Sequence, residues 1–450
     1  MEQSYLPFKY LWLFPDKSLG CLNDLLMLHC YHAPMLTFTW IFLVAIALHL
    51  AIESWLEARH GKHVASHRSA VPDRFADAIS LEAHQKAADY TLAKLRVGKW
   101  NGLYGLALLL IWTLGGGLAW LDGVLSGLQW SSLWVGTAFL VSFVLIGSLL
   151  ELPFSIYNTF VTEVRFGFNR TTPKLFIIDL LKGSLLMVLI GAPLAAIILW
   201  MMESAGTLWW AWAWAFWTGF SIFMMWAYPT LIAPIFNKFE PMEEGETREG
   251  IEALLTRCGF ESNGLFVMDG SKRSSHGNAY FTGFGKSKRI VFFDTLLKQL
   301  KMSETEAVLA HELGHFKRNH IKKRMAVMFA TSLAGFALLG WLAGQLWFYQ
   351  ALGVPEASNH VLLILFTLAL PHFLFWMGPL SSWFSRKHEF EADDYAVDNS
   401  DGAALISALV KMYEDNASTL TPDPLYSAFH DSHPPAPIRV AHIEASMERV

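Results

Sequence analysis

Two histidines and one glutamate in the second half of the chain have the spacing of a metal-binding helix. They lie in the segment SETEAVLAHELGHFKRNH, residues 303–320. Residues four apart lie on one face of an α-helix, so His311 and His315 can offer two imidazole nitrogens to one metal ion. Glu312 directly follows His311, close to such an ion but angled away from it. This pattern indicates two metal ligands with a general base beside them.

The same segment carries signs that it is helical. Ser303 and Glu306 have the form of a capping box, which predicts a helix that begins at about Glu304. The HExxH pattern is typical of zinc peptidases. With 17 histidines in 450 residues, composition alone would produce the pattern in roughly a few per cent of such chains. The helical context and a third ligand therefore decide between a zinc site and a chance match.

A third ligand is expected because a catalytic zinc usually takes three from the protein and leaves one position for water. The best source is the charged run SRKHEFEADD, residues 385–394. Glu389 and Asp393 stand four apart on one helical face, so one can bind zinc while the other supports a zinc-binding histidine. His388 is a rival ligand. The alternative interpretation of such a run is a solvated helix end.

A segment near the C-terminus offers hydrogen-bond donors for the negative charge that develops on a carbonyl oxygen during hydrolysis. This segment is SHPPAPIR, residues 432–439. Its donors are His433, which a proline-stiffened loop could hold in place, and Arg439. On sequence alone the signal is weak, because a His-Pro pair is common on protein surfaces.

The composition is that of a membrane protein. Hydrophobic residues make up 53% of the chain and the mean hydropathy is +0.33. Charged residues make up 16%, against about 25% in soluble domains. The net charge of −5 argues against a nucleic-acid partner. Three cysteines are too few for a disulfide framework or a Cys-rich zinc site, although Cys21 and Cys30 could pair or could simply be two small buried residues.

Seven stretches are apolar over the roughly 20 residues that a membrane-spanning helix needs. Pro371 and Pro379 predict a kink or break in the last stretch, and Pro229 and Pro234 should end the fifth. The predicted fold class is a mainly α, polytopic membrane protein with a zincin-like cytosolic catalytic domain that contains a small β-sheet. The seven stretches are 35–56, 102–121, 133–152, 183–202, 208–231, 325–348 and 361–384.

These spans predict a division of the chain into five parts. The parts are an N-terminal extracytoplasmic segment (1–34), five transmembrane helices with their loops (35–235), a catalytic insert with the HELGH helix (236–324), helices six and seven (325–384) and a C-terminal catalytic segment with the third ligand (385–450).

The catalytic insert is expected to contain both a helix and strands. The helix is expected over 243–258 and the strands over 264–269, 278–284 and 289–294. An extended strand before the HExxH helix could hold a peptide by backbone pairing.

The basic residues of the connecting loops predict the orientation. Loops 122–132, 203–207 and 349–360 contain no Lys or Arg, whereas the other connections are rich in both. The positive-inside rule then places the basic loops, the active helix and the C-terminus on the cytoplasmic side and the N-terminus outside.

Six segments of the chain, in this order, resemble a known family. They are NTFVTEVRFGFNRTTP (158–173), IAPIFNKFEPM (232–242), GSKRSSHGNAYFTGFGKSKRIVFFDTLL (270–297), HELGHFKRNH (311–320), SRKHEFEADDYA (385–396) and SHPPAPIR (432–439). The family is that of the type I CAAX prenyl endopeptidases, integral-membrane zinc proteases that process farnesylated proteins. The resemblance implies seven spanning helices that enclose a water-filled chamber, with one Zn²⁺ per chain at its cytosolic side.

The resemblance also implies the roles of individual residues and an activity, the removal of -aaX from a prenylated Cys-a-a-X terminus. The expected partners are a peptide or protein substrate, prenylated or not, and membrane lipid. The chain itself is expected to be a monomer, since the chemistry needs no second chain. The implied roles are metal ligation by His311, His315 and Glu389, general base catalysis by Glu312, oxyanion contact by His433 and Arg439, support of a ligand by Asp393, and substrate binding along a strand by Asn278, Ala279 and Tyr280.

The compact insert and the C-terminal sequence SMERV, which lacks a dilysine-type signal, favour a bacterial member in the inner membrane; a eukaryotic member would lie in the endoplasmic reticulum membrane. Two other functions are compatible with these residues. One is an HtpX-type quality-control protease without a prenyl requirement, and the other is a non-catalytic metal-binding transporter. A pure binding site has no need of a carboxylate such as Glu312 beside its ligands, which favours a peptidase.

Overall fold

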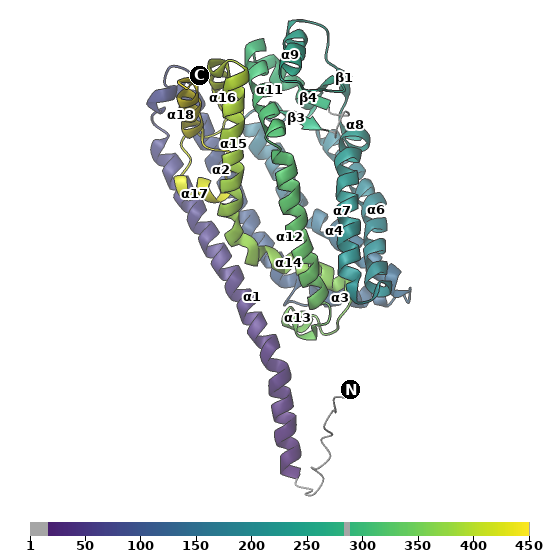
Figure 1. Ribbon diagram of the computed structural model, residues 1–450. Helices are drawn as coiled ribbons and strands as arrows, with labels where there is room; N and C mark the ends of the chain where they lie inside the picture. Colours follow the sequence, from purple (N-terminus) through teal and green to yellow (C-terminus); the bar gives the residue numbers. More distant parts are fainter. Residues whose placement is uncertain (1–16, 283–288, 450) are drawn as a thin grey trace, which may run out of the picture.

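The structure, a computed structural model, describes residues 17–282 and 289–449, with side chains described from residue 34 onward. Long helices run side by side along the molecule (Figure 1). Helix α1 (Lys17–His67) begins at one end, and the chain finishes at the opposite end, which also carries the sheet and the HExxH helix. The side chains of Cys21 and Cys30 lie outside the described part, so their pairing is not tested.

Among the described residues, six helical segments are long and apolar enough to cross a membrane, or seven if one bent pair counts as a span. Large apolar side chains on these helices, such as Trp40, Leu149 and Leu181, are about two-thirds exposed. Such exposure is expected where helices face lipid. The predicted fold class is confirmed. The spanning helices are α1, α2 (Leu81–Trp112) with α3 (Gly117–Ser126), α4 (Ser132–Tyr157), α6 (Pro173–Ser204), α7 (Trp209–Ala227), α12 (His320–Leu342), and α14 (Asn359–Leu374) with α15 (Gly378–Asn399).

Local irregularities occur in the second, the fifth and the last of these spans. The second is bent by 52° between α2 and α3, where Gly116 adopts φ 75°, a conformation that glycine tolerates best. The last is broken by a 3₁₀ turn at Phe375–Met377, as Pro371 and Pro379 predicted. Pro229 does not end the fifth span, because a wider π turn at Tyr228–Ile232 accommodates it and the helix continues to Phe236.

The end of the molecule that carries the HExxH motif contains a four-stranded sheet of order β1-β2-β4-β3. Strands β2 and β4 are parallel, and the other two pairs are antiparallel. The three predicted strands are present, whereas β1 was not expected; residues 283–288 of the predicted 278–284 strand and its turn lie outside the described part. The strands are β1 (Phe239–Pro241), β2 (Leu265–Met268), β3 (Ala279–Thr282) and β4 (Arg289–Phe293).

Short helices surround this sheet and the motif helix. The predicted helix over 243–258 is present as α9. The helices at this end are α9 (Glu246–Arg257), α10 (Asp294–Gln299), α11 (Met302–Lys317), α16 (Gly402–Asp415), α17 (Pro424–His430) and α18 (Ala436–Met447), and the remaining short ones are α5 (Glu163–Arg165), α8 (Ala233–Phe236) and α13 (Leu346–Ala351).

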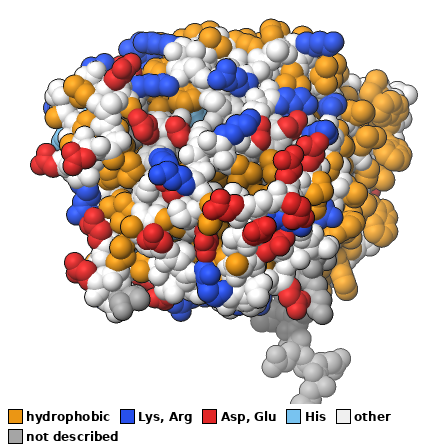
Figure 2. Space-filling model, turned by 90° about the horizontal axis from the view of Figure 1, so that it is seen from above, with side chains coloured by type: hydrophobic (Ala, Val, Ile, Leu, Met, Phe, Trp, Pro, Cys, Tyr) orange, Lys and Arg blue, Asp and Glu red, His pale blue; other side chains and the backbone are white. Residues whose placement is uncertain are grey.

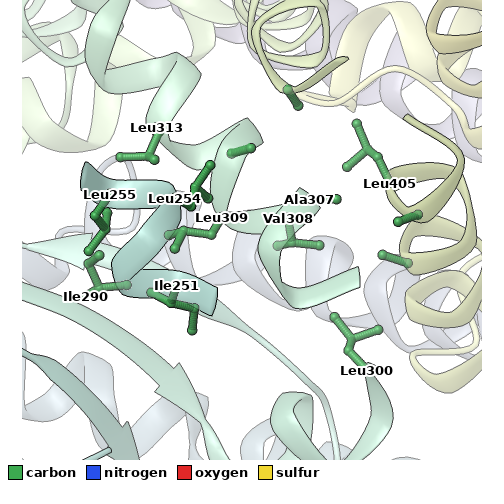
Figure 3. Packing of buried hydrophobic residues seen from close by; sticks show 14 of the residues in the cluster. Ile251, Leu254, Leu255, Ile290, Leu300, Ala307, Val308, Leu309, Leu313 and Leu405 are labelled. Carbon is green, nitrogen blue, oxygen red and sulfur yellow. The ribbon is translucent and has the colours of Figure 1, made fainter. Parts of the chain in front are cut away.

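A hydrophobic core holds the motif helix α11 in place (Figure 3). Leu309 and Leu313 of α11 are buried against Leu254 of α9 and Ile290 of β4, and Leu405 of α16 closes the other side. Each such buried side chain stabilises the fold by about 1.5–3 kcal/mol. The helix that carries the two histidines is therefore fixed on both sides before any metal is considered.

Figure 2 views the molecule from this end. Lys and Arg side chains intermingle with Asp and Glu over the face, and hydrophobic side chains gather along one flank. A charged cap above apolar flanks is the pattern expected where the sheet and α11 stand outside the membrane on top of the spanning helices.

Candidate metal centre

Helix α11 begins two residues earlier than the sequence suggested. The backbone N–H of Lys301 donates to Glu304 Oε2 at 2.7 Å, so the capping carboxylate is Glu304. Glu304 is buried and also accepts from Lys411 Nζ at 2.6 Å. The expected Ser303–Glu306 capping box is wrong, because Glu306 instead pairs with Arg257 at 2.7 Å. The core around α11 decided the register, which a local motif cannot reveal.

Helices α11 and α15 approach each other closely at Gly314, the glycine of HELGH. A Cβ at this position would lie 2.9 Å from Ala392 Cα and 3.1 Å from Tyr395 Cβ. A side chain here would push the helices apart. Gly314 therefore allows α15 to bring its carboxylates within reach of the two histidines on α11.

Three predicted ligands come together between these helices. His311 Nε2 and His315 Nε2 are 3.2 Å apart. Glu389 Oε2 lies 3.4 Å from His311 Nε2, and its Oε1 lies 3.3 Å from His315 Nε2. Glu389 is 2% exposed, so its carboxylate is removed from water. Within the described part of the chain, this is the one group of three or more such side chains whose ligand atoms could hold a metal ion.

The donor set fits a tetrahedral metal. Bonds of about 2.0–2.1 Å to N and O ligands place neighbouring ligand atoms about 3.3–3.4 Å apart, close to the three separations found here. A buried carboxylate that faces two imidazole nitrogens needs a cation or protons between them. Burial opposes protonation of His311, as does Arg439, but Asp393 and Glu389 outweigh them and raise its pKa. A proton and a metal therefore compete for this imidazole.

Asp393 lies behind His311, one helical turn after Glu389. Its Oδ1 is 2.8 Å from His311 Nδ1, and its two oxygens accept from Arg439 Nη2 and Nε, each at 2.7 Å. Asp393 is fully buried and Arg439 is 7% exposed. With Nε2 turned to a metal, His311 carries its proton on Nδ1 and donates it to Asp393. The oxyanion role of Arg439 stays a prediction, and Nη1, 3.9 Å from Glu389, is the nitrogen left for it.

The other two predicted catalytic residues are His433, which contacts the metal group, and Glu312, which directly follows His311 in the chain. His433 Nδ1 lies 2.8 Å from Glu389 Oε2, and 63% of the His433 side chain is exposed. Glu312 is partly exposed and makes no hydrogen bond or ion pair with any other described residue. A carboxylate without a fixed partner is available to a water molecule. His388, the rival ligand, stacks on His320 with ring centroids 4.0 Å apart and does not join the metal group.

Comparisons with known proteins decide the family. Residues 60–238 match the family model of the CAAX prenyl protease N-terminal region with five membrane helices, and residues 241–447 match that of peptidase family M48. A CAAX prenyl protease 1 homolog of Arabidopsis thaliana is 40% identical over 311 residues, which cover 68% of this chain and 73% of that protein. The chain belongs to peptidase family M48.

Other relatives extend the match over almost the whole chain. CAAX prenyl protease 1 of Saccharomyces cerevisiae is 33% identical and covers 89% of this chain, which in turn covers 93% of the yeast protein. The crystal structure of S. mikatae Ste24p superposes with a TM-score of 0.85 at 32% identity, over 90% of this chain and 99% of that one. As an M48 member, the chain is a membrane-embedded metalloendopeptidase, which confirms the interpretation of the HExxH motif.

Two residues that lie behind His315, His320 and Glu391, could not be identified from the sequence. His320 Nδ1 lies 3.0 Å from His315 Nδ1, and His320 Nε2 lies 2.9 Å from Glu391 Oε2. Glu391 stands two residues after Glu389, on a different face of α15, and that face meets the start of α12. The only signal in the sequence was His320 itself, five residues after His315. It lies beyond the end of α11, so helical spacing could not predict that the two rings would meet.

The predicted substrate strand lies at an edge of the sheet. Strand β3 pairs with β4, as in Tyr280 with Val291, and no described strand covers its other edge. A cavity of about 710 Å³ extends to His433, whose Nδ1 contacts Glu389. It is lined by polar side chains that include Tyr90, His276, Asn416 and His433.

Proposed function

We propose that the metal of this site is zinc, held by His311, His315 and Glu389. The proposal rests on the three N and O donors, their separations of 3.2–3.4 Å and the burial of Glu389. Two imidazoles and one carboxylate form a ligand set that catalytic zinc sites use, with one position left open. When bound, zinc polarises the scissile carbonyl and lowers the pKa of a water molecule to about 7.

We assign the proton transfers to Glu312. Its carboxylate stands one residue from His311, is partly exposed and has no partner among the described side chains. It takes the proton of the attacking water and delivers it to the leaving nitrogen as the C–N bond breaks. His433 and Nη1 of Arg439 both lie near Glu389 and would donate to the oxygen that gains negative charge.

The proposed substrate is a protein with a prenylated Cys-a-a-X terminus, from which -aaX is removed. Relatives at 30–40% identity are named CAAX prenyl proteases. An extended peptide could pair with the open edge of β3 through the backbone of Asn278, Ala279 and Tyr280. The cavity beside His433 is lined by polar groups, which suit the peptide part of such a substrate better than its isoprenoid.

We propose that this multi-pass membrane protein is oriented with its metal group and C-terminus towards the cytoplasm. The loops without Lys or Arg lie at the end of the molecule opposite to the metal group, as the positive-inside rule expects. The compartment, a bacterial inner membrane or the endoplasmic reticulum, and the monomeric state also belong to this proposal. None of the proposed chemistry needs a second chain, since the ligands and Glu312 come from one.

The deciding experiment compares two peptides that differ in a farnesyl group on the cysteine of a C-terminal Cys-a-a-X. The full-length protein in detergent is incubated with each, and Glu312→Gln serves as the blank. The proposal expects release of -aaX from the farnesylated peptide and little or none from the other. Equal cleavage of both would contradict the prenyl specificity and favour a broader membrane endopeptidase of the quality-control type.

A further inference from the structure

The metal-binding imidazole of His315 is backed by a second ring. His320 is the first residue of α12 and is 1% exposed. A turn at Asn319 separates α11 from α12, and Asn319 adopts φ 57°, a left-handed conformation that asparagine tolerates better than most residues. This turn brings His320 Nδ1 to 3.0 Å from His315 Nδ1.

A carboxylate completes the chain of contacts. Glu391 Oε2, on α15, lies 2.9 Å from His320 Nε2. Its side chain is 31% exposed, and Lys323 Nζ is more distant at 3.9 Å. The three side chains come from α11, α12 and α15, so the chain of contacts joins the motif helix, a membrane span and the helix of the third ligand.

The hydrogen bonds have one consistent direction. If His315 turns Nε2 to the metal, its proton must sit on Nδ1, because a neutral imidazole carries one. His315 Nδ1–H then donates to His320 Nδ1, which must be bare. The proton of His320 therefore sits on Nε2 and is donated to Glu391. Each ring then has one tautomer, and each of the four ring nitrogens of His315 and His320 faces a partner.

The tautomer of His311, the other predicted imidazole ligand, follows from the same argument, but its carboxylate partner is in direct contact. His311 Nδ1 donates directly to Asp393 Oδ1 at 2.8 Å. A carboxylate that accepts the second ring proton orients a metal-bound histidine and makes it a stronger ligand. For His315 the carboxylate stands one ring further away, and His320 transmits its effect.

We infer that His320 and Glu391 are positioning residues that orient His315 and strengthen its bond to the metal. The inference rests on the proposed role of His315 as a ligand. A competing explanation is packing alone, because the His320 ring stacks on His388 at an interplanar angle of 13°. A ring without nitrogen atoms at position 320 separates the two explanations. It would preserve zinc binding if packing alone mattered, and would weaken it if the hydrogen bonds matter.

The test measures zinc affinity of the metal-free, full-length protein in detergent by competition with a chromophoric chelator, together with its thermal unfolding. His320→Phe keeps an aromatic ring but removes both hydrogen bonds, and should weaken zinc binding about 10–100-fold. Glu391→Gln should weaken it by less, since an amide oxygen still accepts. His320→Gln, which offers one acceptor and one donor, should recover part of the loss of His320→Phe.

Lys323→Met is the matched control, since it removes the exposed neighbour of Glu391 without touching the chain of hydrogen bonds, and should bind zinc like the unaltered protein. Unchanged affinity in both His320→Phe and Glu391→Gln would overturn the inference. A loss of zinc affinity that occurs only in His320→Phe, and only together with a lower unfolding temperature of that variant without metal, would also overturn the inference. Failure of the metal site itself would show separately, as unchanged zinc binding in His315→Ala.

Discussion

Asp393 Oδ1 lies 2.8 Å from His311 Nδ1, at a point where both residues are almost completely buried. This contact joins the two helices of the site, since His311 belongs to α11 and Asp393 to α15. The same carboxylate accepts two hydrogen bonds from Arg439 of α18. Asp393 therefore fixes His311, the guanidinium of Arg439 and the three helices α11, α15 and α18 relative to one another.

Asp393→Asn should weaken both zinc binding and the fold. The amide cannot accept from His311 and Arg439 as the carboxylate does, and it deprives the buried guanidinium of its nearest ion-pair partner. We expect zinc affinity to fall about 10–100-fold and the free energy of unfolding to fall by about 3–5 kcal/mol. Chelator competition and thermal unfolding measure the two effects. Asp394→Asn, a change in a partly exposed neighbour, is the control, and equal effects of the two variants would contradict this account.

Gly314→Ala tests the close approach of α11 and α15. The added methyl group would lie 2.9 Å from Ala392 Cα, against backbone that cannot move aside without shifting a helix. We expect a loss of about 1–3 kcal/mol in the free energy of unfolding and a fall in peptidase activity, because Glu389 would be displaced with α15. Gly335→Ala is the control, since nothing lies within 4 Å of a Cβ there. A fully active, equally stable Gly314→Ala variant would show that the approach is not required.

Glu304 should make stability depend on acid pH. Burial alone would raise the pKa of its carboxyl, but hydrogen bonds from Lys411, the Lys301 N–H and Ser407 hold the pKa below its ordinary value of 4.5. A lowered pKa in the fold adds stability above pH 4.5, and this is lost as the pH falls through the folded-state value. Glu304→Gln should thus have a free energy of unfolding that is lower at pH 7 by about 1.5–3 kcal/mol, and the difference should shrink only as the pH falls below 4.5. A difference that stays constant as the pH falls well below 4.5 would contradict a stabilising role of the ionised Glu304 carboxylate.

Metal removal should inactivate the protein and lower its unfolding temperature. Without a cation, the Glu389 carboxylate faces two imidazole nitrogens in a buried site. Free zinc at 1,000 times its Kd should stabilise the folded state by about 4.1 kcal/mol. The measurement is thermal unfolding and peptidase activity after chelation and after zinc is restored. A melting curve that is insensitive to zinc, with activity retained after chelation, would rule out the proposed centre.

The features that the sequence predicted well depend on local patterns. The spans follow from runs of apolar residues, and the pairing of His311 with His315 follows from helical spacing. Glu389 and Asp393 were identified as a ligand and support pair because four-residue spacing places both on one face of α15. Which of them faces the metal could not follow from spacing, since it depends on the rotation of α15 against α11.

The features that it predicted poorly depend on contacts between distant segments. The cap of α11 was assigned to Ser303 and Glu306, but the partner of Glu304 is Lys411, which is 107 residues away. His320 and Glu391 were missed for the same reason, because their meeting requires the turn at Asn319 and the packing of α12 on α15. The bend between α2 and α3 was hidden within one continuous apolar stretch.

The most direct test of the central claim is the activity and zinc content of Glu312→Gln, measured on the same preparation. The amide has the shape of the carboxylate but cannot take a proton from water. We predict one zinc per chain, as in the unaltered protein, and a peptidase rate that is lower by about 10²–10⁴-fold. Activity close to that of the unaltered protein would contradict the role of Glu312 as general base, and loss of the zinc would contradict its place outside the ligand set.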